Sequence, residues 1–89
     1  MLYKMFIGAN NKTKRVETKK AIAFISKSFQ GLTAYNSLGY WKGKAEKSLI
    51  IAIETTETKK LLKVVKDLTK VLKQQAIGLA KIGKMEFIK

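Results

Sequence analysis

The sequence predicts a single α+β domain, residues 1–89, in which two helices cover one face of a four-stranded antiparallel sheet. Three observations carry this prediction. Apolar residues make up 46% of the chain and are spread along it, which is typical of a globular domain. Strand-like and helix-like patterns of apolar residues follow one another in the order βαββαβ. The link at residues 42–44 is short enough to join two of the strands as an antiparallel hairpin.

The N-terminal third predicts the first strand and the first helix. Leu2 to Ile7 is apolar and aromatic with one lysine, and the turn-forming residues 8–11 end it. From Glu17 to Phe29, apolar residues recur at helical spacing, and Gly31 is expected to end this helix. The apolar residues in question are Ala21, Ile22, Ile25 and Phe29.

Two strands are predicted in the middle of the chain. Residues 32–41 alternate with a period of two, which is typical of a strand. Leu32, Ala34, Leu38 and Tyr40 fall on one side, and Thr33, Tyr35, Ser37 and Trp41 fall on the other. Residues 45–54 contain the apolar run 49–53 and predict a buried strand.

The C-terminal part predicts the second helix and the last strand. Residues 55–57, Thr-Thr-Glu, offer N-cap candidates and an acid for the first turn of a helix that runs to about Gln74. Residues 75–82 carry few charges and predict the fourth strand, and residues 85–88 have room for a short extra C-terminal strand. The apolar face of the helix comprises Leu61, Leu62, Val65, Leu68 and Leu72.

This order of elements is that of a ferredoxin-like split βαβ unit. Two right-handed crossovers place the first and third strands in the centre of the sheet and the second and fourth at its edges. The helices cover only one face, so Tyr, Phe and Ile side chains stay exposed on the other. Small proteins of this shape bury such a face by associating. We therefore expect a homotrimer.

The composition excludes several kinds of chemistry. The chain has no Cys and no His, so it lacks disulfides, thiolate chemistry and an imidazole base, and we expect neither a metal nor a cofactor. No apolar run approaches the roughly 18 residues that cross a bilayer. Residues 1–8 are too short and too interrupted for a signal peptide. We expect a cytoplasmic protein without a membrane partner.

The charge of the chain favours anionic ligands. The formal net charge is +13, from 19 Lys and Arg residues against 6 Asp and Glu residues, and such an excess attracts polyanions. All but one of the cations are lysines, and they are dispersed through helices and loops. Arginine forks and exposed stacking aromatics, which read bases, are scarce. A specific nucleic-acid-binding surface is therefore not favoured.

Residues 39–48 form the most informative segment, because they gather the only Trp, a Tyr, two Gly and a lone acid. Glu46 is expected at the entrance of a strand, beside aromatic surface. An aromatic face attracts a cation, and a carboxylate can hold an ammonium group. The simpler alternatives are that Glu46 pairs with a neighbouring lysine at a strand edge, and that Tyr40 and Trp41 pack across strands.

The layout resembles that of the phage S-adenosylmethionine lyases, whose family fold is similar to the trimeric PII signalling proteins. It also resembles a group of short phage and bacterial proteins with a Gly-Tyr-Trp segment followed by Glu-x-Ser. Residues 39–41 (Gly-Tyr-Trp) and 46–48 (Glu-Lys-Ser) stand in the order of the lyase segments Gly-x-Tyr and Glu-Lys-Thr. Residues 74–77 resemble the Gln-x-x-Val that opens the last strand of that family. The resemblance covers most of the chain.

The resemblance implies a PII-like, oligomeric phage-type enzyme that acts at a subunit interface, in the host cytoplasm if the protein is phage-encoded. Its substrate is S-adenosylmethionine, its products are homoserine lactone and methylthioadenosine, and no cofactor is needed. Glu46 then orients or polarises the substrate, and either Tyr40 or Trp41 packs on it as the aromatic partner. The remaining substrate-binding candidates are Gly8, Asn10, Asn11 and Ser48. The two Asn residues are also ordinary turn formers.

The main alternative is a non-catalytic, PII-like module that binds or sequesters an anionic nucleotide between subunits. Trp41 then stacks on the base, and five cations supply phosphate contacts. These cations are Lys12, Lys14, Arg15, Lys42 and Lys44. A phage protein that binds a host protein is a third reading of the same chain.

Overall fold

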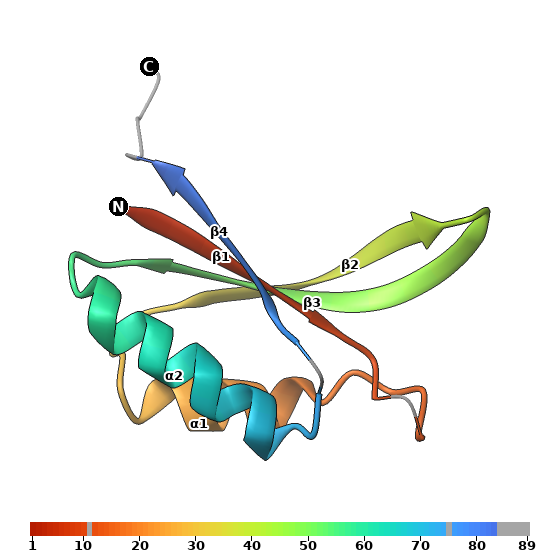
Figure 1. Cartoon of the computed structure of the whole chain (residues 1–89), viewed down its shortest axis with the longest axis horizontal. Helices are drawn as coiled ribbons and strands as arrows, with labels where there is room; N and C mark the ends of the chain where they lie inside the picture. Colours follow the sequence, from red (N-terminus) through yellow and green to blue (C-terminus); the bar gives the residue numbers. More distant parts are fainter. Residues whose placement is uncertain (11, 75, 84–89) are drawn as a thin grey trace.

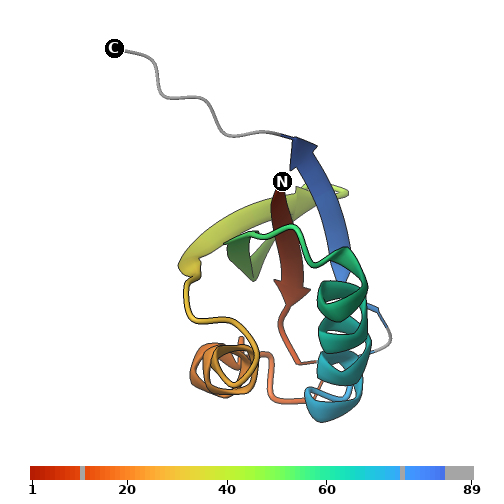
Figure 2. The same ribbon diagram turned by 90° about the vertical axis from the view of Figure 1, so that its left-hand side faces the viewer.

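The computed structural model describes residues 1–10, 12–74 and 76–83. The elements along the chain are β1 (Leu2–Gly8), α1 (Thr18–Ser26), β2 (Thr33–Trp41), β3 (Lys44–Glu54), α2 (Thr58–Val71) and β4 (Gly78–Gly83). Both helices lie on one side of a four-stranded antiparallel sheet (Figures 1 and 2). The predicted ferredoxin-like βαββαβ arrangement is confirmed. The extra strand expected at residues 85–88 lies outside the described residues.

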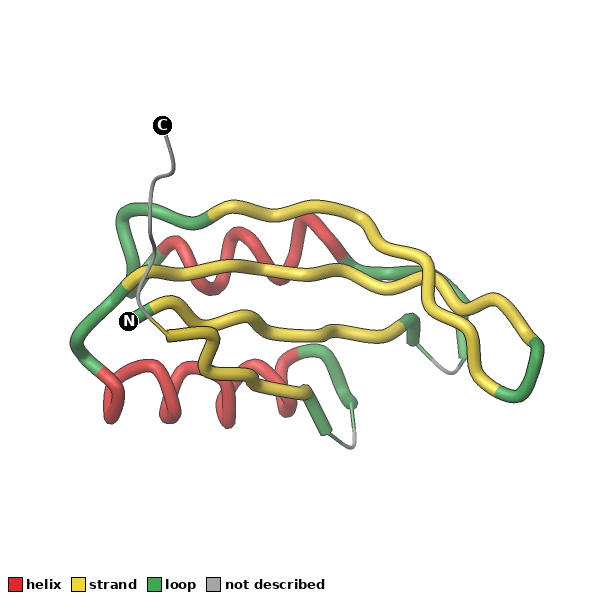
Figure 3. The backbone as a smooth tube through the Cα atoms, turned by 90° about the horizontal axis from the view of Figure 1, so that it is seen from above, coloured by secondary structure: helices red, strands yellow, loops and turns green. Residues whose placement is uncertain are grey.

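The sheet has the strand order β2-β3-β1-β4, so β1 and β3 are central as predicted. All of β1 pairs with β3, from Leu2 opposite Glu54 to Gly8 opposite Ser48. Strand β3 is longer than β1, and residues 44–47 pair only with β2. The β2–β3 hairpin therefore projects beyond the end of β1 and beyond the helices (Figure 3).

The core lies between the helices and the inner face of the sheet. Alternate residues of the two central strands point toward the helices, and each is at most 5% exposed. These are Tyr3, Met5 and Ile7 of β1 and Leu49, Ile51 and Ile53 of β3. The helices add Ala21 and Ile25 of α1 and Leu61, Val64, Val65 and Leu68 of α2. Burying each large apolar side chain contributes about 1.5–3 kcal/mol.

The helix and strand ends differ from the predicted ones. Helix α1 ends at Ser26 with Lys27 as its C-cap, so Gly31 is not the cap. Helix α2 ends at Val71, short of Gln74, and β4 begins at Gly78. On α2, Leu62 is 52% exposed and does not belong to the buried face. Val64, two residues further along α2, is buried and was not among the predicted residues of this face.

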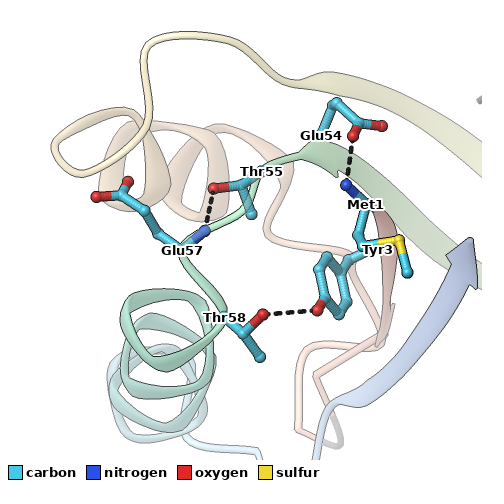
Figure 4. Close-up of polar contacts among 6 residues, drawn as sticks. All are labelled: Met1, Tyr3, Glu54, Thr55, Glu57 and Thr58. Carbon is cyan, nitrogen blue, oxygen red and sulfur yellow. Dashed lines mark hydrogen bonds and ion pairs between the residues drawn. The ribbon is translucent and has the colours of Figure 1, made fainter. Parts of the chain in front are cut away.

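Helix α2 begins without a side-chain cap. Its N-cap is Glu57, whose side chain makes no capping hydrogen bond, and the first turn contains no acid. Instead, the Glu57 N–H donates to the Thr55 hydroxyl at 3.0 Å. The Tyr3 and Thr58 hydroxyls share a hydrogen bond of 2.8 Å, which ties β1 to the start of the helix (Figure 4).

The outer face of the sheet keeps an apolar row across its three longest strands. Phe6, Ile50 and Tyr35 lie opposite one another on β1, β3 and β2, and they alternate with the buried residues of β1 and β3, so they are on the face turned away from the helices. Phe6 is 42% and Tyr35 is 39% exposed. The Lys4 ammonium lies 5.8 Å from the centre of the Tyr35 ring, within the range of a cation–π contact. The expectation of exposed aromatic side chains on this face is confirmed.

Candidate functional site

A hollow of about 590 Å³ opens where β1 ends and β3 continues. We call it the β1-end hollow. It gathers Gly8, Asn10, Glu46 and Ser48 from the predicted lyase site, and Lys14 from the alternative nucleotide site. Its lining residues are Gly8, Ala9, Asn10, Lys14, Gly39, Ala45, Glu46, Lys47 and Ser48. Residues that are far apart in the sequence thus meet because the loop after β1 turns back beside the hairpin.

Glu46 is exposed on β3, directly opposite Gly39 of β2. It is the one acid in the described part of the chain that has neither an ion-pair nor a hydrogen-bond partner. The others pair with Lys20, the Met1 amino group, Lys60 and Lys63, in the pairs Glu17–Lys20, Glu54–Met1, Glu57–Lys60 and Asp67–Lys63. The simple reading of Glu46 as the partner of a neighbouring lysine therefore does not hold, and its carboxylate is available to a ligand.

The side chain of Asn10 is used by the loop that follows β1. Its Oδ1 accepts hydrogen bonds from the N–H groups of Lys12 at 2.8 Å and Thr13 at 3.2 Å, and its Nδ2 donates to Glu17 at 3.3 Å. This is the turn-forming role of an asparagine. Asn10 therefore shapes the wall of the hollow, while the candidate Asn11 lies outside the described residues.

Gly8 and Ser48 face each other where the β1–β3 ladder ends. The Gly8 carbonyl accepts a hydrogen bond of 2.6 Å from the Gln74 side-chain amide, which joins the end of α2 to the rim of the hollow. The Ser48 hydroxyl hydrogen bonds to the Ser37 hydroxyl of β2. Sequence reasoning did not include Gln74 among the site residues, although its place in the resemblance to the lyase family was a signal for it.

Tyr40 does not share a face with Glu46. It lies opposite Ala45, one residue along the hairpin from the Gly39–Glu46 pair, so strand alternation turns the two side chains to opposite faces. Tyr40 is 70% exposed and does not line the hollow. Within one subunit, the two predicted catalytic residues therefore do not meet. Trp41 ends β2 opposite Lys44, and its side chain is outside the described part of the structure.

The predicted phosphate-binding cations fall into two groups. Lys14 and Arg15 line a second hollow of about 620 Å³ beside the first, between the loop after β1 and the hairpin. Lys42 and Lys44 lie at the hairpin tip and line neither hollow, and Lys12 also lies outside both linings. Lys47, which was not predicted, lines both hollows together with Lys14.

The hairpin tip sets the register of the site. Lys42 and Gly43 form a two-residue turn with φ of 51° and 77°, as in a type I′ hairpin turn. This turn pairs Trp41 with Lys44 and consequently Gly39 with Glu46. A glycine opposite Glu46 leaves the carboxylate uncovered across the strands.

A third hollow, of about 940 Å³ and larger than the two just described, lies at the other end of the sheet and is lined by none of the predicted site residues. Its charged lining residues include Glu54, Glu57 and Lys60, each of which is already ion-paired. Over residues 1–10, 12–74 and 76–83, no three potential metal ligands lie close enough to hold an ion. No helix in that part of the chain has the length and apolar character needed to cross a membrane.

No known protein family matches this chain, and neither does any curated protein. A similar solved structure is that of "De novo designed protein Foldit4", with a TM-score of 0.51 and 13% sequence identity over 94% of each chain. At this identity the similarity concerns the fold alone. It agrees with the two-layer βαββαβ arrangement and carries no argument about function.

Proposed function

We propose that the chain is a small oligomeric lyase that cleaves S-adenosylmethionine, with Glu46 at a site between subunits. The observation that supports this most is the Glu46 carboxylate, which is exposed, has no partner among the described residues and lies on the rim of the β1-end hollow. The substrate is inferred from residues 39–41 and 46–48, whose motifs resemble those of the phage lyases.

The reaction balances without a metal, a cofactor or a proton transfer. One oxygen of the substrate carboxylate attacks Cγ, the bond from Cγ to sulfur breaks, and its electron pair stays on sulfur. The sulfonium becomes the thioether of methylthioadenosine, and the other product, homoserine lactone, keeps the ammonium group. In this proposal Glu46 binds that ammonium and orients the chain so that the carboxylate approaches Cγ from behind.

The proposed site needs a second copy of the chain. Among the described residues that line the hollow none is aromatic, and the hollow is open to solvent in a single subunit. Tyr40 projects from the opposite face of the hairpin and is 70% exposed. We assign the sulfonium contact to Tyr40 of a neighbouring copy, because an aromatic face attracts a cation. Repeating this head-to-tail contact closes a ring, for which a trimer remains our expectation.

The first test follows both products by chromatography after incubation with S-adenosylmethionine. We expect the wild type to release methylthioadenosine and homoserine lactone in equal amounts, and Glu46→Gln to be at least about 100-fold slower. Glu57→Gln is the matched control, because it makes the same change at an exposed acid at the other end of the sheet. A wild type without product, or an active Glu46→Gln variant, contradicts the proposal.

The second test asks whether Tyr40 and Glu46 act from different copies. Tyr40→Ala and Glu46→Gln are each expected to be inactive. After mixing, unfolding and refolding in equal amounts, about one quarter of the interfaces combine an intact Tyr40 with an intact Glu46. Activity should therefore return to about one quarter of the wild-type value. If both residues act within one chain, mixing restores nothing.

The second candidate function is the non-catalytic binding of an anionic nucleotide. Lys14 and Lys47 favour it, because both line the two adjoining hollows, and Arg15 lines one of them. A calorimetric titration with ATP separates the candidates. For a nucleotide-binding module, Lys14→Ala should weaken binding and Glu46→Gln should strengthen it by removing a like charge. For the lyase, Glu46→Gln slows the turnover of S-adenosylmethionine at least about 100-fold, regardless of its effect on ATP binding.

A further inference from the structure

The outer surface of α2 carries a stripe of lysines that neither candidate function uses. Lys59, Lys63, Lys66 and Lys70 follow one another at spacings of four, three and four residues. At 3.6 residues per turn they lie within about 60° of one another around the helix axis and extend over about 16 Å. The buried residues Leu61, Val64, Val65 and Leu68 occupy the opposite side of the helix. Because these buried residues face the sheet, the stripe lies on the side of α2 that is turned away from the sheet.

Most of this positive charge is not neutralised within the described chain. Lys63 lies 4.0 Å from the Asp67 carboxylate, which is a long and exposed contact. Lys59, Lys66 and Lys70 have no acidic partner among the described residues. Like charges three or four residues apart on a helix destabilise it by about 0.2–0.5 kcal/mol per pair. The stripe contains three such pairs of consecutive lysines, and the two lysines of each pair repel each other. A bound polyanion relieves this repulsion.

We propose that the lysine stripe of α2 binds the phosphate backbone of double-stranded nucleic acid without reading its sequence. Four cations in a straight row fit a line of phosphates, since binding to a duplex is dominated by charge. Lysine places a point charge and lacks the planar fork with which arginine recognises guanine. The proposal does not depend on the lyase function, and association through the open sheet face leaves the helices outside.

Two other anionic partners fit this surface less well. A helix that lies in a membrane surface needs an exposed apolar face, and the one strongly exposed large apolar residue of α2 is Leu62. A single-stranded nucleic acid needs aromatic side chains on which its bases stack. The exposed aromatic residues of the described chain, Phe6, Tyr35 and Tyr40, belong to the strands and not to the helices.

The test compares two triple variants of equal net charge. Lys59, Lys66 and Lys70 are changed to Gln in the first, and the hairpin residues Lys42, Lys44 and Lys47 are changed to Gln in the second. All six lysines are exposed, so circular dichroism should show an intact fold for both. Fluorescence anisotropy with a labelled 20-base-pair duplex of arbitrary sequence, over a range of salt concentrations, then reports affinity and its salt dependence.

We expect the stripe variant to bind the duplex at least about tenfold more weakly than the hairpin variant at low salt. Each lost phosphate contact should reduce the slope of log K against log salt by about 0.9, so three lost contacts reduce it by roughly 2.7. Equal weakening in both variants would show that net charge, and not the stripe, drives binding. The proposal is also overturned if the wild type binds single-stranded DNA or phosphatidylserine vesicles more tightly than the duplex, or binds none of these probes.

Discussion

Replacing Ile50 with lysine tests whether the open face of the sheet is an interface between copies. Ile50 lies in the middle of the row formed with Phe6 and Tyr35 and is half-buried in a single chain. In a monomer, the new ammonium reaches solvent from this face, so the free energy of unfolding should change by less than about 1 kcal/mol. In an oligomer that covers the face, the new ammonium is removed from solvent, its cross-strand neighbours Phe6 and Tyr35 are not acids, and Lys4 on the same face adds a like charge.

The expected weakening of subunit association follows from the cost of burying the new charge. Leaving a charge buried without a partner costs about 3–5 kcal/mol, and 1.4 kcal/mol corresponds to a tenfold change in an equilibrium constant. We therefore expect Ile50→Lys to raise the dissociation constant between subunits by at least about 100-fold. Analytical ultracentrifugation at micromolar concentration should show an oligomer for the wild type and a monomer for the variant.

Leu62→Lys is the matched control, because it makes the same kind of change at an exposed position on the helical side. It should leave the oligomer intact. A wild type that sediments as a monomer, or an Ile50→Lys variant that keeps the wild-type oligomeric mass, would refute the assignment of this face to an interface. Loss of the fold in Ile50→Lys, visible by circular dichroism, would refute the premise that the position is solvent-accessible in a monomer.

Three further predictions concern stability. Tyr3→Phe removes the hydrogen bond to Thr58 and should lower the free energy of unfolding in urea by about 1 kcal/mol; an unchanged midpoint would contradict it. Ile51→Ala empties a fully buried position on a central strand and should cost about 2–5 kcal/mol by the same measurement, whereas a cost below 1 would show that the core closes over the cavity. Gly43→Ala forces a side chain into a positive φ and should cost about 1–2 kcal/mol locally, seen as faster amide exchange confined to the hairpin tip; unchanged exchange would contradict it.

Most of the fold could be predicted because each element has a clear period. The strand order followed from the crossovers and required no knowledge of side-chain packing. The predicted buried face of α2 was wrong at one position, because helical periodicity alone could not decide which of two adjacent leucines is buried. Leu61 and Leu62 are adjacent on α2, and only the position of the sheet decides that Leu61 is buried and Leu62 is exposed. Phe29 fits the helical pattern in the sequence although α1 ends at Ser26. The Phe29 N–H donates to the Ile25 carbonyl at 3.0 Å, and this turn after the helix keeps the Phe29 side chain in the core.

The candidate site was harder to predict, because its residues meet through register and loop shape. The sequence grouped Tyr40 with Glu46, since both fall within one short segment. A link of three residues left their faces undecided, whereas the two-residue Lys42-Gly43 turn fixes Tyr40 opposite Ala45 and puts it on the other face. The use of the Asn10 amide within its own loop depends on contacts with Lys12, Thr13 and Glu17, which no periodicity reveals.

The arrangement of the hairpin explains why Glu46 has no ion-pair partner among the described residues, and this explanation can be tested. Lys47 points to the opposite face, Lys44 lies two residues away along the strand at about 6.6 Å, and the residue across from Glu46 is Gly39, which has no side chain. Among the described residues other than its two chain neighbours, the atom nearest to a Cβ added at Gly39 would be the Glu46 carbonyl oxygen at 3.9 Å, which is an ordinary contact distance for a side chain. Gly39→Lys therefore places an ammonium directly opposite the carboxylate, where opposite charges attract across strands by about 0.2–1 kcal/mol.

We expect Gly39→Lys to fold normally and to reduce turnover of S-adenosylmethionine at low substrate concentration by about two- to sixfold, because the lysine competes with the substrate ammonium for Glu46 and an attraction of at most about 1 kcal/mol corresponds to a factor of about 5. The reduction should appear mainly as a higher KM, since saturating substrate displaces the lysine. Gly39→Ala, which fills the same space without charge, is the control and should stay near the wild-type rate. If the alanine variant is equally impaired, Gly39 is needed for the backbone conformation or for close contact with a neighbouring copy. In that case the activity does not depend on an unpaired Glu46 carboxylate.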